Sequence, residues 1–207
     1  MGAEARAQRG ARCGAPRRAA GNGLRPIVFD DRDRVAYLTR FHAIARERHW
    51  TIQASSLLDT HHHCVVETPA PDLSDGMRRV LGGHAAWLNA RHRRSGAVFG
   101  ERFWSTRVDG DAQLVRACLY TFLNPVVAGV VCHPQDWPWS SYRTLVEDGC
   151  SPRLTAILGD SPEDARTHLL ELVDEAVEAL RETRENDRVA SLRIAGALAA
   201  RTAKGRG

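Results

Sequence analysis

Apolar positions recur at steps of three and four residues in three stretches of the chain, which is the spacing of one helix face. These stretches cover residues 31–45, 73–88 and 162–180. Asp31 or Asp33 is available as the N-cap of the first helix. A fourth helix is expected at about 111–124, where Pro125 would help to end it.

Strand patterns lie between the helices. Residues 51–58 and 62–67 alternate or are rich in β-forming residues, and residues 103–108 read as a short third strand. The expected order is helix, strand, strand, helix, strand, helix, with an extended segment ahead of the first helix. This order predicts an α+β fold, an antiparallel sheet with helices on one face, followed by a C-terminal helical tail.

Length and composition fit one globular domain with an accessory tail. The chain has 207 residues, of which 43% are hydrophobic. We expect a basic, partly disordered segment at 1–24, a catalytic domain at 25–145 and an acidic helical tail at 146–207. No stretch is apolar enough to span a membrane, and the N-terminus lacks a signal sequence, so a cytoplasmic protein without membrane contact is expected.

The charge is uneven along the chain although its net value is only +4. Residues 74–107 hold seven arginines against two acids, whereas residues 160–187 hold ten acids. A basic middle is typical of a surface that faces a polyanion. Charge alone is equally compatible with two solvated helix faces of opposite sign.

Five cysteines are scattered and never spaced as Cys-x-x-Cys. This pattern argues against a disulfide framework and against a structural zinc knuckle, so reduced thiols are expected.

A run of three histidines is the densest chemical feature. On a strand alternate residues share a face, so His61 and His63 would point one way and His62 the other. Two imidazoles about 7 Å apart along a strand can converge on one metal ion. Surface or core histidines remain the alternative.

Tyr120 and Asn124 form a second candidate pair, because residues four apart stack on one helix face. A tyrosine can act as a covalent nucleophile, and an asparagine carbonyl can complete the coordination of a metal. The alternative is that Tyr120 packs in the core and Asn124 caps the helix end.

Further motifs surround these residues. Residues 31–34, Asp-Arg-Asp-Arg, open the helix that comes before the strand with His61, His62 and His63. Residues 94–103 read Arg-Ser-Gly-Ala-Val-Phe-Gly-Glu-Arg-Phe. Residues 119–130 contain Tyr-x-x-x-Asn-Pro-x-x-Ala-Gly, with Trp-Pro-Trp-Ser-Ser-Tyr at 137–142. In this order and spacing the blocks resemble the HUH single-tyrosine transposases, in particular the REP-associated and insertion-sequence types. The resemblance covers about 57% of the chain.

The resemblance implies a ferredoxin-like HUH palm that cleaves and rejoins single-stranded DNA in transposition. Tyr120 would be the nucleophile and form a 5′-phosphotyrosine, and His61, His63 and Asn124 would hold a divalent metal. Mixed nitrogen and oxygen ligands favour Mg²⁺ or Mn²⁺. Single-stranded or hairpin DNA is the expected partner, and a homodimer is left open. The arginines expected along the DNA are Arg78, Arg91, Arg93, Arg94, Arg102 and Arg107.

The beginning of the domain departs from the family pattern. The family's first strand would correspond to residues 15–22, which contain Pro16 and few β-forming residues. A degenerate first strand is therefore expected, and the alternative function is a catalytically impaired or domesticated protein that binds a DNA hairpin. A histidine-dependent phosphodiesterase is a third alternative, but no second His-x-(Ser/Thr) element is present.

Overall fold

The expected order of helices and strands is found in the computed structural model, which describes residues 9–13, 25–100 and 103–182. The chain divides into two compact units near residue 107. Residues Gln53–Ser56 belong with the second unit although they precede the division in sequence. From the sequence, the catalytic domain was expected to extend to residue 145.

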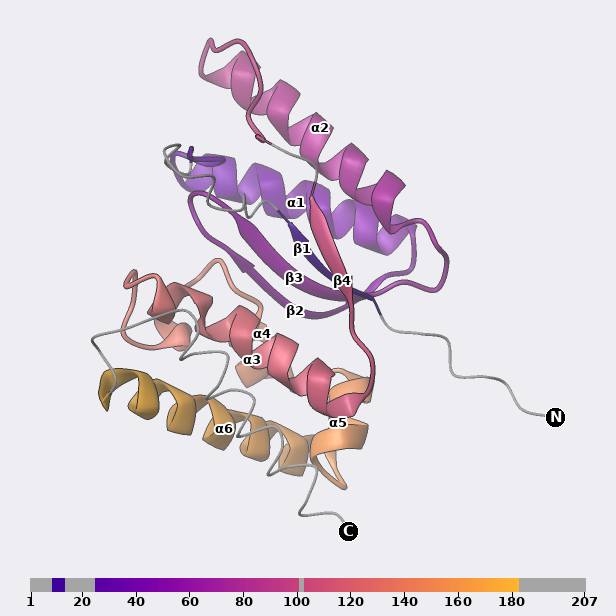
Figure 1. The fold of residues 1–207 in the computed structure, drawn as a ribbon, viewed down its shortest axis with the longest axis vertical. Helices are drawn as coiled ribbons and strands as arrows, with labels where there is room; N and C mark the ends of the chain where they lie inside the picture. The colour runs from indigo at the N-terminus through magenta and orange to yellow at the C-terminus, as the bar shows by residue number, and fades with distance from the viewer. Residues whose placement is uncertain (1–8, 14–24, 101–102, 183–207) are drawn as a thin grey trace, which may run out of the picture. The chain divides into compact units, whose positions relative to one another are not determined.

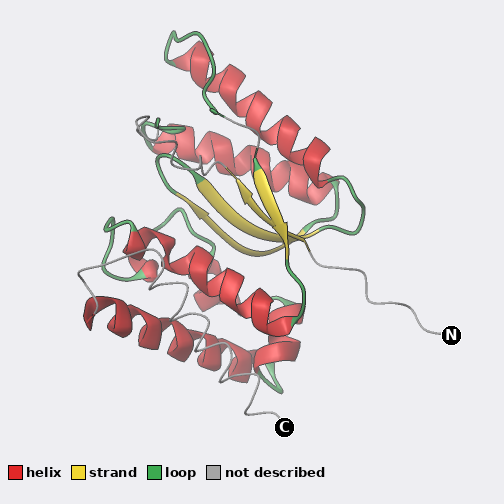
Figure 2. Ribbon diagram, viewed as in Figure 1, coloured by secondary structure: helices red, strands yellow, loops and turns green. Residues whose placement is uncertain are grey.

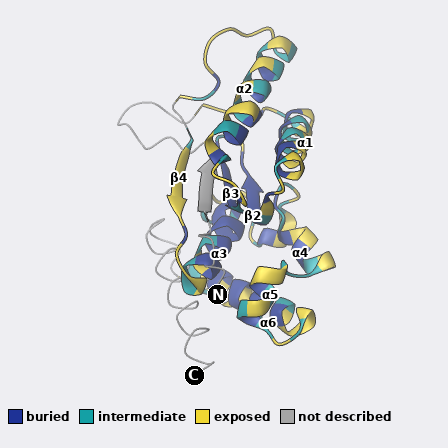
Figure 3. Ribbon diagram, turned by 90° about the vertical axis from the view of Figure 1, so that its right-hand side faces the viewer, coloured by how far each residue is buried: buried dark blue, intermediate teal, exposed yellow. Residues whose placement is uncertain are grey.

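The sheet is four-stranded, with strand order β2-β3-β1-β4. Its strands are β1 (Arg9–Cys13), β2 (Thr51–Leu57), β3 (His62–Glu67) and β4 (Trp104–Arg107). β1 pairs antiparallel with both neighbours, so that Arg9 lies opposite Val66 of β3 and Arg107 of β4. The expected antiparallel α+β fold is confirmed, and β4 is an exposed edge strand (Figure 3).

The first strand lies earlier in the chain than expected. It was expected at residues 15–22, which fall outside the described residues, whereas the structure forms it at Arg9–Cys13. This segment contains few β-forming residues, but its backbone is paired on both sides, with β3 and with β4. Backbone pairing in the middle of a sheet therefore outweighs weak local β-propensity.

Helices α1 (Asp31–Glu47) and α2 (Leu73–Arg91) lie on the same side of the sheet (Figure 1). The N-cap of α1 is Asp30, whose carboxylate accepts a hydrogen bond from the Asp33 amide at 3.1 Å. The expectation of Asp31 or Asp33 as the cap was wrong by one to three residues. Asp33 is instead completely buried.

Gly76 of α2 is required because an indole ring lies against it. A Cβ at this position would lie 2.3 Å from the Trp50 ring. The ring has little freedom to move, since Trp50 is buried and its Nε1 donates to Asp72 at 2.9 Å. Gly82 of the same helix is exposed, with nothing within 4 Å of its Cβ position.

These two glycines make a matched pair of substitutions. We expect Gly76→Ala to lower the free energy of unfolding by about 2 kcal/mol through overpacking. Gly82→Ala should raise it by roughly 0.5–1 kcal/mol, because alanine favours a helix interior. Urea unfolding of both variants measures the difference. A gain in stability from Gly76→Ala would show that Trp50 is not held in this position.

The second unit is mostly helical (Figure 2). Its elements are α3 (Asp111–Val127), the 3₁₀ turn η1 (Pro134–Asp136), α4 (Tyr142–Asp148), α5 (Pro152–Leu158) and α6 (Pro162–Glu182). α6 begins as predicted, with the Ser161 hydroxyl accepting from the Asp164 amide at 3.1 Å. Leu169, Val173 and Ala176 of α6 are fully buried, so this acidic helix contributes to the core of its unit.

α3 continues past the proline that was expected to end it. Pro125 lies inside the helix, which runs to Val127. Proline lacks an amide hydrogen and so removes one bond of the final turn. The amide of Ala128 still donates to Asn124 at 2.9 Å, and that of Val130 donates to Pro125 at 3.0 Å, so the turn remains closed. Among the described residues no helix is long and apolar enough to cross a membrane.

Candidate active site

The structure brings two of the predicted metal ligands together in the first unit. The rings of His61 and His63 lie edge to face, with centroids 4.7 Å apart, and both residues are 3% exposed. The Thr60 hydroxyl lies 2.9 Å from Nδ1 of His61. A polar partner on one ring nitrogen is the usual way to fix the tautomer and orientation of a metal-binding histidine.

His62 points to the opposite face, as the alternation of the strand predicts. Its ring packs edge to face on Tyr37 and Phe41 of α1, and its Nδ1 lies 3.2 Å from the Tyr37 hydroxyl. Burial, together with the charges of His42 and His61, lowers the pKa of His62 to about 3. It is therefore a neutral core histidine that separates the two candidate ligands.

The donor atoms of the histidine pair are suited to a divalent metal. Two imidazoles on one face supply two nitrogen ligands for a divalent ion. Within the described ranges no group of three or more His, Cys, Asp or Glu is arranged to hold an ion. The amide oxygen of Asn124, which the resemblance implies as a third ligand, belongs to α3 of the second unit.

Tyr120 and Asn124 lie one turn apart on α3 in the second unit. Tyr120 is 8% exposed and Asn124 is 3% exposed. The chain has three tyrosines, and the other two, Tyr37 and Tyr142, are 0% and 1% exposed. Tyr120 is therefore the most exposed of the three tyrosines.

A short segment after α3 is hydrogen-bonded to Gln53–Ser56, the residues of β2 that belong to the second unit. The Ser141 amide donates to the Ser55 carbonyl at 2.8 Å, and the Ser55 amide donates to the Ser141 hydroxyl at 2.9 Å. Tyr142 then packs against Phe122 of α3, with ring centroids 5.4 Å apart. The Ser-Ser-Tyr motif thus fixes α3 by backbone pairing and aromatic packing.

The arginines expected along DNA differ in how they are held. Arg93, Arg94 and Arg107 are exposed. Arg78 is exposed as well and pairs with Asp75 one turn away. Arg102 lies outside the described residues.

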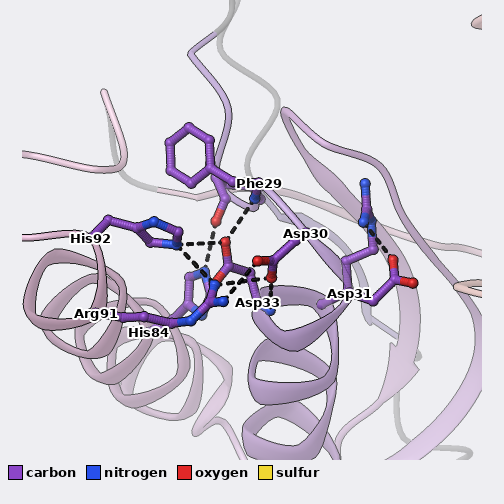
Figure 4. Close-up of polar contacts among 9 residues, drawn as sticks. Phe29, Asp30, Asp31, Asp33, His84, Arg91 and His92 are labelled. Carbon is purple, nitrogen blue, oxygen red and sulfur yellow. Dashed lines mark hydrogen bonds and ion pairs between the residues drawn. The ribbon is translucent and has the colours of Figure 1, made fainter.

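Arg91 belongs to a cluster that the sequence did not predict (Figure 4). Its guanidinium donates twice to Asp30, at 2.7 and 2.9 Å, and also donates to the buried Asp33. Asp33 accepts further from the Phe29 amide at 2.8 Å, and Nε2 of His92 lies 2.9 Å from the same carboxylate. The cluster joins the beginning of α1 to the end of α2.

The electrostatics of this cluster favour ionised carboxylates. Burial acts to raise the pKa of Asp33, but the hydrogen bonds from Phe29, His92 and Arg91 outweigh it, and the net shift is downward. The Arg91 guanidinium lowers the pKa of Asp30 to about 2. Both aspartates are therefore charged at neutral pH.

Comparison with curated proteins identifies two similar sequences, whereas no family model matches the chain. The REP-associated tyrosine transposase of Escherichia coli K12 is 27% identical over 113 residues, which are 53% of this chain and 64% of that protein. A putative REP-associated tyrosine transposase of Haemophilus influenzae is 26% identical over 140 residues, covering 58% of this chain and 79% of the relative. The chain thus spans slightly less than two thirds of the length of the first relative.

A solved structure shares the fold. It is described as a REP-associated tyrosine transposase bound to a REP hairpin, and it superposes with a TM-score of 0.55 at 20% identity. The match covers 74% of this chain and 90% of the other. The expected resemblance to tyrosine transposases is confirmed by sequence and by fold.

Proposed function

We propose, from the resemblance of this chain to the REP-associated tyrosine transposases, that it cleaves and rejoins single-stranded DNA through Tyr120. The observation that carries the proposal is the convergence of His61 and His63, whose ring centroids are 4.7 Å apart. Tyr120 and Asn124 on one face of α3 supply the remaining expected groups. Hairpin DNA is the proposed substrate, since a REP hairpin is bound in the similar solved structure.

The reaction needs a nucleophile in line with the bond that breaks. The Tyr120 hydroxyl oxygen attacks phosphorus while the bond from phosphorus to the 3′ oxygen breaks. The tyrosine loses its proton, the departing 3′ oxygen gains one as a hydroxyl, and the 5′ phosphate remains on Tyr120. Attack by another 3′ hydroxyl reverses these steps and joins the strands without an external energy source.

The histidines and Asn124 would hold the proposed divalent ion, Mg²⁺ or Mn²⁺. Such an ion supplies charge neutralisation on the non-bridging phosphate oxygens when bound. His62 anchors the strand against α1 through its contacts with Tyr37 and Phe41, and His61 and His63 lie on the opposite face. The exposed Arg93, Arg94 and Arg107 are proposed to contact the DNA backbone.

Covalent capture of DNA tests this proposal. A single-stranded hairpin labelled at its 3′ end should give a protein band that survives SDS and heating with Mn²⁺ or Mg²⁺, and none with EDTA. His61→Ala and His63→Ala should each lower the yield about 100-fold or more, because several kcal/mol of charge stabilisation are lost. His42→Ala, a change at an exposed histidine of α1, is the matched control and should leave the yield unchanged.

The same experiment distinguishes DNA cleavage from the alternative function, which is hairpin binding without cleavage. Salt-dependent hairpin binding without an adduct under either metal would identify a protein that binds DNA without cutting it. An adduct that is insensitive to EDTA and to both histidine variants would contradict the metal site.

A further inference from the structure

An exposed aromatic ring with a guanidinium on its face lies at the beginning of α1. Phe29 is 44% exposed, although large apolar side chains are usually buried. The Arg94 guanidinium carbon lies 4.9 Å from the centre of the Phe29 ring. The two residues are far apart in sequence, so the tertiary structure places one on the other.

The loop that carries Arg94 is held in place by its own hydrogen bonds. The Arg94 amide donates to the Asn89 carbonyl at 2.9 Å, and the Asn89 side-chain amide donates to the Gly96 carbonyl at 2.9 Å. Arg93 has a φ of 51°, a left-handed conformation that side chains rarely adopt. A loop closed in this way presents Arg93 and Arg94 in a defined direction.

Phe29 is fixed from the other side. Its amide donates to the buried Asp33 carboxylate at 2.8 Å, and its ring lies 4.9 Å from the ring of His92. Nε2 of His84 in α2 lies 2.7 Å from the carbonyl oxygen of Ile27, two residues before Phe29. The segment before α1 is thus anchored to α2, and the ring has a defined position.

The charge around the ring favours an anionic ligand. The nearby Asp30 is paired with Arg91, and Asp31 is paired with Arg34 at 2.8 Å. Arg93 and Arg94 are exposed beside them. Carboxylates neutralised by ion pairs repel a phosphate less than the exposed arginines attract it.

We propose that Phe29 and Arg94 form a stacking site for one unpaired base of single-stranded DNA, with Arg93 directed to an adjacent phosphate. The site rests on the proposed function, because it specifies how the DNA partner is bound. Flat bases stack on aromatic rings and on guanidinium planes, and a positively charged surface beside the ring follows the backbone. The ring, its guanidinium and the neighbouring arginine provide each of these features.

Binding without cleavage tests the site. The full-length Tyr120→Phe protein in EDTA is titrated into a fluorescent DNA hairpin with single-stranded tails, and anisotropy gives Kd. Phe29→Ala in this background should weaken binding roughly tenfold, whereas Phe29→Tyr should retain it. The matched control is Val35→Ala, which removes a 53% exposed apolar side chain of α1 and should leave Kd unchanged.

Abasic substitution locates the base. Removing one base from the tail should weaken binding to the parent about tenfold at a single position and leave binding to Phe29→Ala unaffected there. Equal Kd values for the parent and Phe29→Ala, or equal sensitivity to every abasic position, would overturn the stacking site. Arg94→Gln, expected to weaken binding at the same position, serves as a second variant if Phe29→Ala does not fold.

The binding measurements also distinguish failure of the stacking site from failure of the proposed function. A parent protein that binds no single-stranded DNA would overturn the proposed substrate and the stacking site together. Tight binding that is insensitive to Phe29 would overturn the stacking site alone.

Discussion

Replacing Tyr120 with phenylalanine is expected to lower the yield of the covalent DNA adduct by about 10,000-fold or more. Phenylalanine keeps the ring but removes the oxygen that forms the bond to phosphorus, and loss of a nucleophile is among the largest effects known in catalysis. Because Tyr120 is 8% exposed and the ring is retained, the fold should survive, with a change in stability of about 1 kcal/mol or less. The yield of the SDS-stable adduct measures the loss.

The other two tyrosines supply matched controls. Tyr37→Phe removes a hydroxyl that lies 3.2 Å from His62, and Tyr142→Phe removes one from a residue that is 1% exposed. Each should retain the adduct, with at most a small loss of stability. Equal loss of adduct in all three variants would point to a general structural effect rather than to Tyr120.

Replacing Asp33 with alanine is expected to lower the free energy of unfolding by about 3 kcal/mol. The substitution removes a fully buried carboxylate and with it the acceptor of the Phe29 amide. It also leaves Arg91 and His92 without this partner, and removing one member of a buried charged pair is strongly destabilising. The loss should lie at the lower end of such effects, because the Arg91 and His92 side chains are each 25% exposed.

Asp31→Ala is the matched control for this second prediction. Asp31 also lies in the first turn of α1 and pairs with Arg34, but its side chain is 78% exposed. An exposed pair of this kind contributes about 1 kcal/mol or less. Urea unfolding at neutral pH compares the variants, and equal losses would contradict an anchoring role for Asp33.

The pH dependence of stability provides an independent check on Asp33. Its pKa is lowered in the folded protein, although burial alone would raise it, because hydrogen bonds from Phe29, His92 and Arg91 prevail. The stabilisation is therefore present above the unfolded pKa, about pH 4, and is lost as pH falls through the folded pKa. The difference in the free energy of unfolding between the wild type and Asp33→Ala should therefore become smaller below about pH 4.

Local periodicity explains which parts of the fold were predictable. β2, β3 and the long helices were expected from apolar spacing, and the opposite orientations of His62 and His63 follow from the geometry of a strand. The start of α6 follows from Ser161 and Pro162, a cap followed by a proline. α5 starts with the same signal, Ser151 followed by Pro152, and was predictable from it.

Features that depend on distant residues were not predictable. β1 has no apolar alternation, and its place between β3 and β4 is set by backbone pairing across the sheet. Asp33 was considered only as a helix cap, because its partner Arg91 lies 58 residues away. For the same reason Arg91 was expected on the DNA path, whereas its guanidinium is held by Asp30 and Asp33.

Identifying the residue that is covalently bonded to the DNA is the most direct test of the central proposal. The SDS-stable adduct is digested with nuclease and trypsin, and mass spectrometry identifies the peptide that retains a nucleotide. Modification of Tyr120 through a 5′ phosphate is the predicted result. Modification of Tyr37, Tyr142 or a residue other than tyrosine would contradict the account.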